Sequence, residues 1–205
     1  MSTPPLIHIV DDDESLRTAL LRLLTAAGFA ARGYGSTGEF LLHPPPDRPG
    51  CILLDLRLPG PSGLDLQDAM HDHGIDLPVI FLTGHGDVAS SVRAMKSGAV
   101  DFLEKPVASN TLLGAVARAL ARDLEARNQR HHSHQLRARF AMLTPRERQV
   151  FERVVAGKPN KVIADEIGIA ERTVKLHRAQ LMAKVGADSP AELGGLAEQL
   201  RLLPD

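Results

Sequence analysis

The 205-residue chain has a single cysteine, no tryptophan and only 3% aromatic residues. One cysteine excludes an internal disulfide framework, which suits a reducing cytoplasm. No apolar run approaches membrane-spanning length, and the N-terminus lacks the basic-then-apolar pattern of a signal peptide. The hydrophobic content of 43% can still build real cores, which must be mainly aliphatic. We therefore expect a cytoplasmic protein without a membrane partner, built as one large or two small domains.

The charges are distributed unevenly, although the formal net charge is only −1. Residues 1–123 carry 10 Lys and Arg against 15 Asp and Glu, whereas residues 124–205 carry 14 against 10. An acidic first part joined to a basic second part indicates that the second part meets a polyanion. On charge alone, ordinary solvated surface remains the alternative.

Short apolar runs alternate with helical patterns through residues 1–123. The predicted strands are Leu6–Val10, Ala30–Tyr34, Cys51–Leu54, Pro78–Leu82 and Asp101–Leu103. Between them, apolar residues recur at helical spacing, and a final helix begins near Ser109. This alternation predicts an α/β doubly wound (βα)5 domain over residues 1–123. A polar linker, partly helical, is expected over residues 124–141.

Reactive polar side chains follow four of these strands at the point where each strand ends. They are Asp11 and Asp12 after the first strand, Asp55 after the third, Thr83 after the fourth and Lys105 after the fifth. The carboxyl ends of parallel strands meet at one edge of the sheet, where open α/β sheets place their chemistry. Asp13 is expected to cap the next helix, so the metal role is assigned only to Asp11 and Asp12 of that acidic run.

Three carboxylates, a hydroxyl and an ammonium at one sheet edge predict a metal-dependent phosphoryl site. Asp11, Asp12 and Asp55 offer the oxygen ligands that Mg2+ prefers, and the backbone carbonyl of Arg57 can add another. Asp55 is the expected nucleophile, because a carboxylate can attack phosphorus and form an acyl phosphate. Lys105 can pair with a phosphoryl oxygen, and the Thr83 hydroxyl can donate to one.

The last part of the chain, residues 142–205, contains only short helical patterns. Thr144, Pro145 and Glu147 give an N-cap, a proline at the first helical position and a glutamate three residues after the cap. The next two helices are predicted over Asn160–Ile167 and from Glu171 to Val185, joined by a turn that contains Gly168, and a fourth runs from Ser189 to Leu202. Two short helices joined in this way predict a helix-turn-helix within a small all-α, four-helix domain.

The third of these helices is the predicted recognition helix for DNA. Val174, Leu181 and Val185 form its core side, and basic residues near its N-terminal part can reach base edges and phosphates. Lys161 and Arg172 are interpreted as phosphate contacts, and Thr173 either donates to a phosphate or caps the helix. The predicted DNA-binding residues are Lys161, Arg172, Thr173, Lys175, Leu176 and Arg178.

Residues 6–122 resemble a two-component receiver of the NarL/FixJ response regulators, on the FixJ side. The resemblance is carried by the site residues together with the segments 83–88 and 98–106. It implies phosphotransfer from a sensor histidine kinase to Asp55, with slow dephosphorylation and no other catalysis. It also implies a switch formed by Thr83 and Phe102, in which Phe102 replaces the tyrosine of many receivers and offers no hydroxyl.

Residues 141–202 resemble LuxR-type helix-turn-helix domains. Segments 143–150, 160–164 and 172–178 carry the resemblance, in the order of the family. It implies DNA operators with paired half-sites, RNA polymerase as a further partner, and a homodimer formed on phosphorylation. The expected dimer face comprises the 88–97 helix, the fifth strand and the helix from Ser109, with Val92, Met95 and Leu113 as apolar candidates.

Other interpretations compete with this one. The main alternative is a phosphorylation-independent DNA-binding regulator with a degenerate receiver. A phosphatase would need a general acid beside Asp55, and the position two residues later is Arg57. A ligand-sensing regulator has no support from a pocket motif. The histidines at 71 and 73, and at 131, 132 and 134, are read as solvated side chains rather than as metal ligands.

Overall fold

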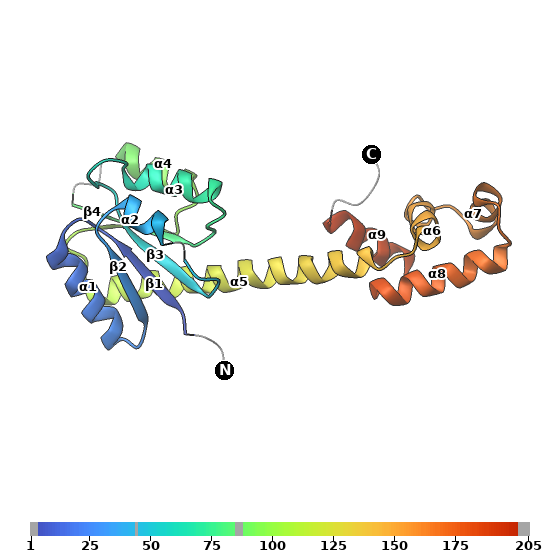
Figure 1. The fold of residues 1–205 in the computed structure, drawn as a ribbon, viewed down its shortest axis with the longest axis horizontal. Coiled ribbons are helices and arrows are strands. Elements are labelled where there is room, and N and C mark those ends of the chain that lie inside the picture. The colour runs from blue at the N-terminus through green and yellow to red at the C-terminus, as the bar shows by residue number, and fades with distance from the viewer. Residues whose placement is uncertain (1–3, 44, 85–87, 201–205) are drawn as a thin grey trace. The chain divides into compact units, whose positions relative to one another are not determined.

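The computed structural model describes residues 4–43, 45–84 and 88–200 (Figure 1). The chain divides into two compact units, residues 1–127 and 128–205. The 85–87 part of the receiver-like motif lies outside the described residues. Among the helices of the described segments, none is both long and apolar enough to cross a membrane.

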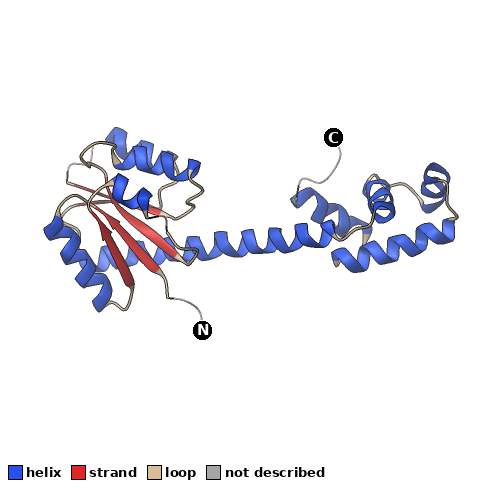
Figure 2. Ribbon diagram, in the orientation of Figure 1, coloured by secondary structure: helices blue, strands red, loops and turns tan. Residues whose placement is uncertain are grey.

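The first unit is built on a five-stranded parallel sheet in the order β2-β1-β3-β4-β5 (Figure 2). The strands are β1 (Leu6–Val10), β2 (Ala30–Tyr34), β3 (Gly50–Asp55), β4 (Val79–Thr83) and β5 (Asp101–Glu104). This order and direction confirm the predicted doubly wound fold. Every residue of the central strand β3 is buried, which explains why its sequence is a continuous apolar run rather than an alternating one.

Helices cover both faces of the sheet. On one face, α1 (Glu14–Ala26) and the first part of α5 (Ser109–Ala141) share an aliphatic core with the strands. On the other face lie α2 (Thr37–Leu42), α3 (Gly63–Asp72) and α4 (Val88–Lys96), whose core includes Tyr34, Phe40 and Phe81. Strand side chains point alternately to the two faces, so each strand contributes to both cores.

The Asp13 cap predicted from the sequence is present at the start of α1. Its side chain accepts hydrogen bonds from the backbone amides of Ser15 and Leu16, at 2.9 and 3.1 Å. A cap of this kind satisfies amides that have no partner within the helix. It commits the Asp13 carboxylate to the helix, so the first two aspartates of the run remain for the site.

The structure differs most from the sequence prediction at residues 124–141, the expected linker. This segment is the second half of one continuous 33-residue helix, α5. In the first unit, Asp123 is buried and accepts a hydrogen bond from the Gly50 amide at 3.0 Å and another from Arg127 at 2.9 Å. Arg127 also donates to Asp47 at 2.6 Å and to the Arg48 carbonyl at 2.7 Å. The helix is therefore fastened to the start of β3 as far as Arg127, beyond the boundary expected at residue 123.

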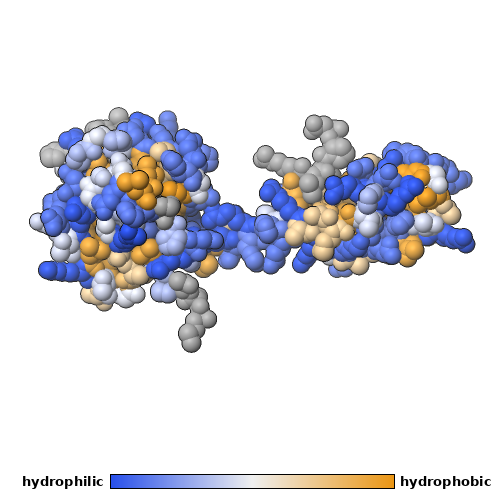
Figure 3. Space-filling view, in the orientation of Figure 1, coloured by the Kyte–Doolittle hydropathy of each residue, from blue (hydrophilic) through white to orange (hydrophobic). Residues whose placement is uncertain are grey.

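The last turns of α5 belong to the second unit. Leu136 and Phe140 are buried in its core, so part of the segment expected as a linker is the first helix of that unit. The polar composition concealed this because only these two residues, one turn apart, face the core. Figure 3 colours the middle of α5 as hydrophilic, in keeping with its Arg, Asn, Gln and His residues.

The remaining helices are α6 (Pro145–Val155), α7 (Asn160–Ile167), α8 (Glu171–Val185) and α9 (Pro190–Gln199). The predicted capping box between Thr144 and Glu147 is formed at the start of α6. The buried Glu147 carboxylate also accepts a hydrogen bond from Lys184 at 2.6 Å, which ties α6 to α8. Gly168 ends α7 in the left-handed conformation, at φ 67°, and opens the turn into α8.

A buried histidine makes the stability of the first unit depend on pH. His8 lies against the Tyr34 and Phe40 rings, and its Nδ1 is 3.0 Å from the Tyr34 hydroxyl. Burial, assisted by the charges of Arg32 and Arg48, lowers the pKa of His8 from 6.5 to about 4. Between these values the unfolded chain binds more protons than the folded one, so stability falls as the pH falls.

We expect His8 to reduce the free energy of unfolding by about 3 kcal/mol between about pH 7 and pH 4. The fluorescence of Tyr34, the one tyrosine in a chain without tryptophan, reports on this unit during denaturant unfolding. The variant His8→Leu should lack this part of the pH dependence, whereas Tyr34→Phe, followed by circular dichroism, should keep it. Identical pH slopes for wild type and His8→Leu would contradict the assignment.

Candidate functional site

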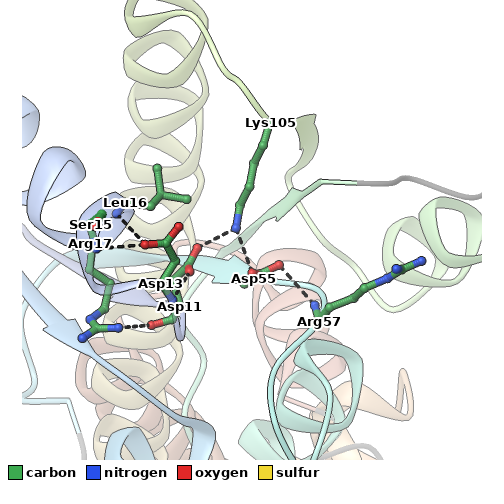
Figure 4. A network of polar contacts seen from close by, with 8 residues as sticks. All are labelled: Asp11, Asp13, Ser15, Leu16, Arg17, Asp55, Arg57 and Lys105. Carbon is green, nitrogen blue, oxygen red and sulfur yellow. Dashed lines mark hydrogen bonds and ion pairs between the residues drawn. The ribbon is translucent and has the colours of Figure 1, made fainter.

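Three carboxylates converge at the carboxyl edge of the sheet, as predicted. Asp11 and Asp12 follow β1, Asp55 ends β3, and one oxygen from each lies within 4.8 Å of the others. Figure 4 shows Asp11 and Asp55 of this cluster. Asp11 and Asp55 are buried, whereas Asp12 is exposed. This set of hard oxygen donors, open to solvent on one side, fits a divalent cation that keeps part of its water shell.

Lys105 closes the site from the end of β5. Its ammonium donates to Asp11 Oδ2 at 2.7 Å and to Asp55 Oδ2 at 2.8 Å (Figure 4). Burial raises the pKa of Asp11, and the hydrogen bond from Lys105 only partly offsets that effect. Burial opposes the charge of Lys105 as well, but the bonds to both carboxylates outweigh it and raise the pKa of the ammonium. The lysine therefore stays charged and neutralises the acidic pair. The Lys105-Pro106 peptide bond is cis.

The loop after β3 fixes the Asp55 carboxylate through a backbone hydrogen bond. The Arg57 amide donates to Asp55 Oδ1 at 3.1 Å, and the Arg57 side chain points away from the site (Figure 4). A ligand role for the Arg57 carbonyl stays a prediction. Gly63, at the start of α3, lies so close that an added Cβ would be 2.3 Å from the Asp55 carbonyl oxygen. Only glycine fits there, so the loop can pack tightly against the strand end.

Arg17 is a site residue that the sequence interpretation missed. From α1, its guanidinium donates to the Asp11 carbonyl at 2.7 Å (Figure 4). Its side chain passes Gly33 and Gly35, where an added Cβ would lie 3.7 and 3.8 Å from Arg17 atoms. These are ordinary van der Waals distances at which a Cβ would also fit, so the glycines do not signal this passage in the sequence. Arg17 thus fixes the backbone that carries Asp11.

The two predicted switch residues lie on neighbouring strands. Thr83 ends β4 and is fully buried, and its carbonyl accepts a hydrogen bond from the Lys105 amide at 2.7 Å. Phe102 on β5 is half-buried and is paired in register with Phe81, with the ring centroids 6.3 Å apart. Thr83 therefore lies beside Lys105, whereas Phe102 lies three residues before Lys105 and packs on the sheet face that carries α4.

The predicted DNA-binding residues lie in the second unit, on α7 and α8. Lys161, Arg172, Lys175 and Leu176 are exposed, as contact with a ligand requires. The N-cap of α8 is Ala170, so the capping role predicted for Thr173 is wrong. The other predicted role of Thr173, donation to a DNA phosphate, stays a prediction. Arg178 is half-buried, and its guanidinium donates to Asn160 Oδ1 at 2.9 Å, joining α8 to the start of α7.

Family comparisons agree with both units. Residues 7–117 match the family described as "Response regulator receiver domain". Residues 141–197 match "Bacterial regulatory proteins, luxR family". The first match covers the sheet and the acidic site at its edge, and the second covers the helices from α6 into α9.

Relatives of similar length match nearly the whole chain. The transcriptional regulatory protein FixJ of Rhizobium meliloti is 44% identical over 191 residues, which cover 93% of this chain and 94% of that protein. Nodulation protein W of Bradyrhizobium diazoefficiens is 43% identical over 199 residues, covering 97% of this chain and 88% of that protein.

Solved structures give the same result. The response regulator StyR superposes with a TM-score of 0.83 at 42% identity, covering 96% of this chain and all of the other. Full-length FixJ from B. japonicum superposes with a TM-score of 0.59 at 38% identity, over the whole of both chains. The chain therefore belongs to the NarL/FixJ-type response regulators, transcription factors with a receiver domain and a LuxR-type DNA-binding domain.

Proposed function

We propose that this response regulator accepts a phosphoryl group on Asp55 in a Mg2+-dependent reaction and thereby controls its binding to DNA in the cytoplasm. The observation that carries the proposal is the convergence of Asp11, Asp12 and Asp55 within 4.8 Å, with Lys105 bonded to two of them. A degenerate receiver would have lost part of this set. Here all the charged groups that the chemistry needs are in one place.

The donor is the phosphohistidine of a sensor histidine kinase. A carboxylate oxygen of Asp55 forms a bond to phosphorus, and the phosphorus–nitrogen bond breaks, leaving its electron pair on the histidine ring. Asp11, Asp12 and Asp55 would hold Mg2+, which would supply positive charge to offset that of the transferred group. Lys105 exchanges its contact with Asp55 for a phosphoryl oxygen, and the Thr83 hydroxyl donates to another. Slow hydrolysis of the acyl phosphate returns the receiver to rest, without a further enzymatic activity.

The phosphoryl group acts on DNA binding indirectly, because Asp55 and α8 belong to different units. We infer that Thr83 moves toward the phosphoryl group and that Phe102 fills the space it leaves. The face formed by α4, β5 and α5 then becomes competent to pair with a second copy. A dimer places two α8 helices on paired half-sites, one or more turns of DNA apart. RNA polymerase is the expected partner of the bound dimer.

The site makes a direct prediction about labelling. Incubation with a small phosphodonor and Mg2+ should add one phosphoryl group to the wild-type chain, because Asp55 is the acceptor. Asp55→Asn should remain unlabelled, and so should the wild type after removal of the metal with a chelator. Intact-mass spectrometry gives the readout.

A matched control keeps this test specific. Asp72→Asn changes an exposed aspartate at the end of α3, outside the acidic cluster, and should be labelled like the wild type. Undiminished labelling of Asp55→Asn would refute Asp55 as the acceptor, and labelling that survives the chelator would refute the metal requirement.

The dimer face makes a second prediction. On α4, Val92 and Met95 are 46% and 50% exposed, so two apolar side chains lie on the surface expected to pair. Met95→Asp should keep the phosphorylated chain monomeric in sedimentation velocity, because a buried unpaired carboxylate destabilises an interface. The wild type should form dimers under the same conditions.

Leu42→Asp is the matched control, since Leu42 on α2 is 80% exposed and lies outside that face. It should dimerise on phosphorylation as the wild type does. If Met95→Asp dimerises equally well, α4 does not contribute to the interface. A wild type that remains monomeric when fully phosphorylated would defeat the dimer proposal itself.

A further inference from the structure

The inner side of α8 defines which residues can face a ligand. Val174, Leu181 and Val185 are fully buried, so the opposite side of this helix, with 3.6 residues per turn, is the outward face. The exposed residues on or beside that face are Arg172, Lys175, Leu176, Ala179, Gln180 and Ala183. In the DNA-binding unit this face is the surface that enters a groove.

Two cations of α8, Lys175 and Arg178, have partners within the unit and lie toward the sides of this face. Arg178 is half-buried and donates to Asn160 of α7 at 2.9 Å. Lys175 forms an ion pair with Glu171, one turn earlier, at 3.4 Å. Positions of this kind suit phosphate contacts, which orient a protein on DNA without reading its sequence. Arg172 lies on the outward face in the first turn of the helix, and the exposed residues of the face after Lys175 are uncharged: Leu176, Ala179, Gln180 and Ala183.

Two of these uncharged side chains have the chemistry of base readers. Leu176 is the large apolar residue of this face, with 55% of its surface exposed, and burial against a thymine methyl group would remove that surface from water. Gln180 follows one turn later and is also exposed. A glutamine side chain can donate to adenine N7 while it accepts from the adenine N6 amino group.

The small neighbours of this pair allow close approach. Ala179 and Ala183 lie beside Leu176 and Gln180 on the outward face and project only a methyl group each. The helix axis can therefore come near the base edges, within reach of a leucine and a glutamine side chain. Larger residues at these two positions would hold the helix away from the floor of the groove.

We propose that Leu176 and Gln180 select A·T base pairs in each half-site, Leu176 through a thymine methyl group and Gln180 through the N6 and N7 atoms of an adenine. This inference rests on the DNA-binding part of the proposed function and adds to it the class of base pair that the chain reads. Gln180 was not among the residues assigned to DNA from the sequence.

The test uses the full-length chain, treated with a small phosphodonor and Mg2+, to select duplexes from a random-sequence library. Affinities are then measured for the selected duplex with single-base analogues. Replacing the read adenine by 7-deazaadenine removes the N7 acceptor and should weaken wild-type binding about fivefold or more. Replacing the read thymine by uracil removes one methyl group and should weaken it about fourfold.

A base analogue should no longer weaken binding when the side chain that contacts the altered base atom has been removed. Gln180→Ala should bind the adenine and 7-deazaadenine duplexes equally, and Leu176→Ala should bind the thymine and uracil duplexes equally. Gln180→Glu should shift the preference at the same position toward cytosine, because a carboxylate accepts from the cytosine amino group. A purely structural role for Gln180 would produce no such shift.

Gln129→Ala, at an exposed glutamine of α5, is the matched control and should respond to both analogues as the wild type does. The inference is overturned if Gln180→Ala still discriminates against 7-deazaadenine at every selected adenine, or if the selected half-sites contain no fixed A·T pair. In either case the proposed DNA binding stands. If the chain enriches no sequence at all, the inference and the proposed operator binding fail together.

Discussion

The receiver is organised around one electrostatic constraint, the neutralisation of three carboxylates that the parallel strands bring to one edge of the sheet. Lys105 meets this constraint in the structure through bonds of 2.7 and 2.8 Å to Asp11 and Asp55. Because Asp11 is fully buried, its charge cannot be left without a partner. Any group that takes over one of these contacts, a cation or a phosphoryl group, must therefore move Lys105. The end of β5, the strand that also carries Phe102, would respond.

Much of the first unit and its site could be predicted from the sequence, because the evidence there is local. Each strand is an apolar run of a few residues, and each site residue directly follows its strand, so parallel packing is enough to bring Asp11, Asp55 and Lys105 together. The Asp13 cap and the Thr144–Glu147 capping box are local as well. Their partners lie within three residues.

The features that escaped prediction depend on partners far away in the chain. Asp123 bonds to the Gly50 amide across 73 residues, so nothing near Asp123 indicates that it is buried. Leu136 and Phe140 face the second core from a helix whose other residues are polar. The bond from Arg178 to Asn160 comes from the packing of α7 on α8, and the contact of Arg178 with DNA stays a prediction. Burial and pairing of this kind follow from tertiary structure rather than from periodicity.

In the proposed mechanism, a phosphoryl group on Asp55 gates DNA binding by a separate unit. The direct test compares operator affinity, at one salt concentration, for full-length chain with and without phosphorylation and for a fragment of residues 128–205, which keeps Leu136 and Phe140 in its core. We expect tight binding by the phosphorylated chain, weak binding by the unphosphorylated chain, and weak, phosphorylation-independent binding by the fragment. Equal affinity of the two full-length forms would contradict gating by the phosphoryl group.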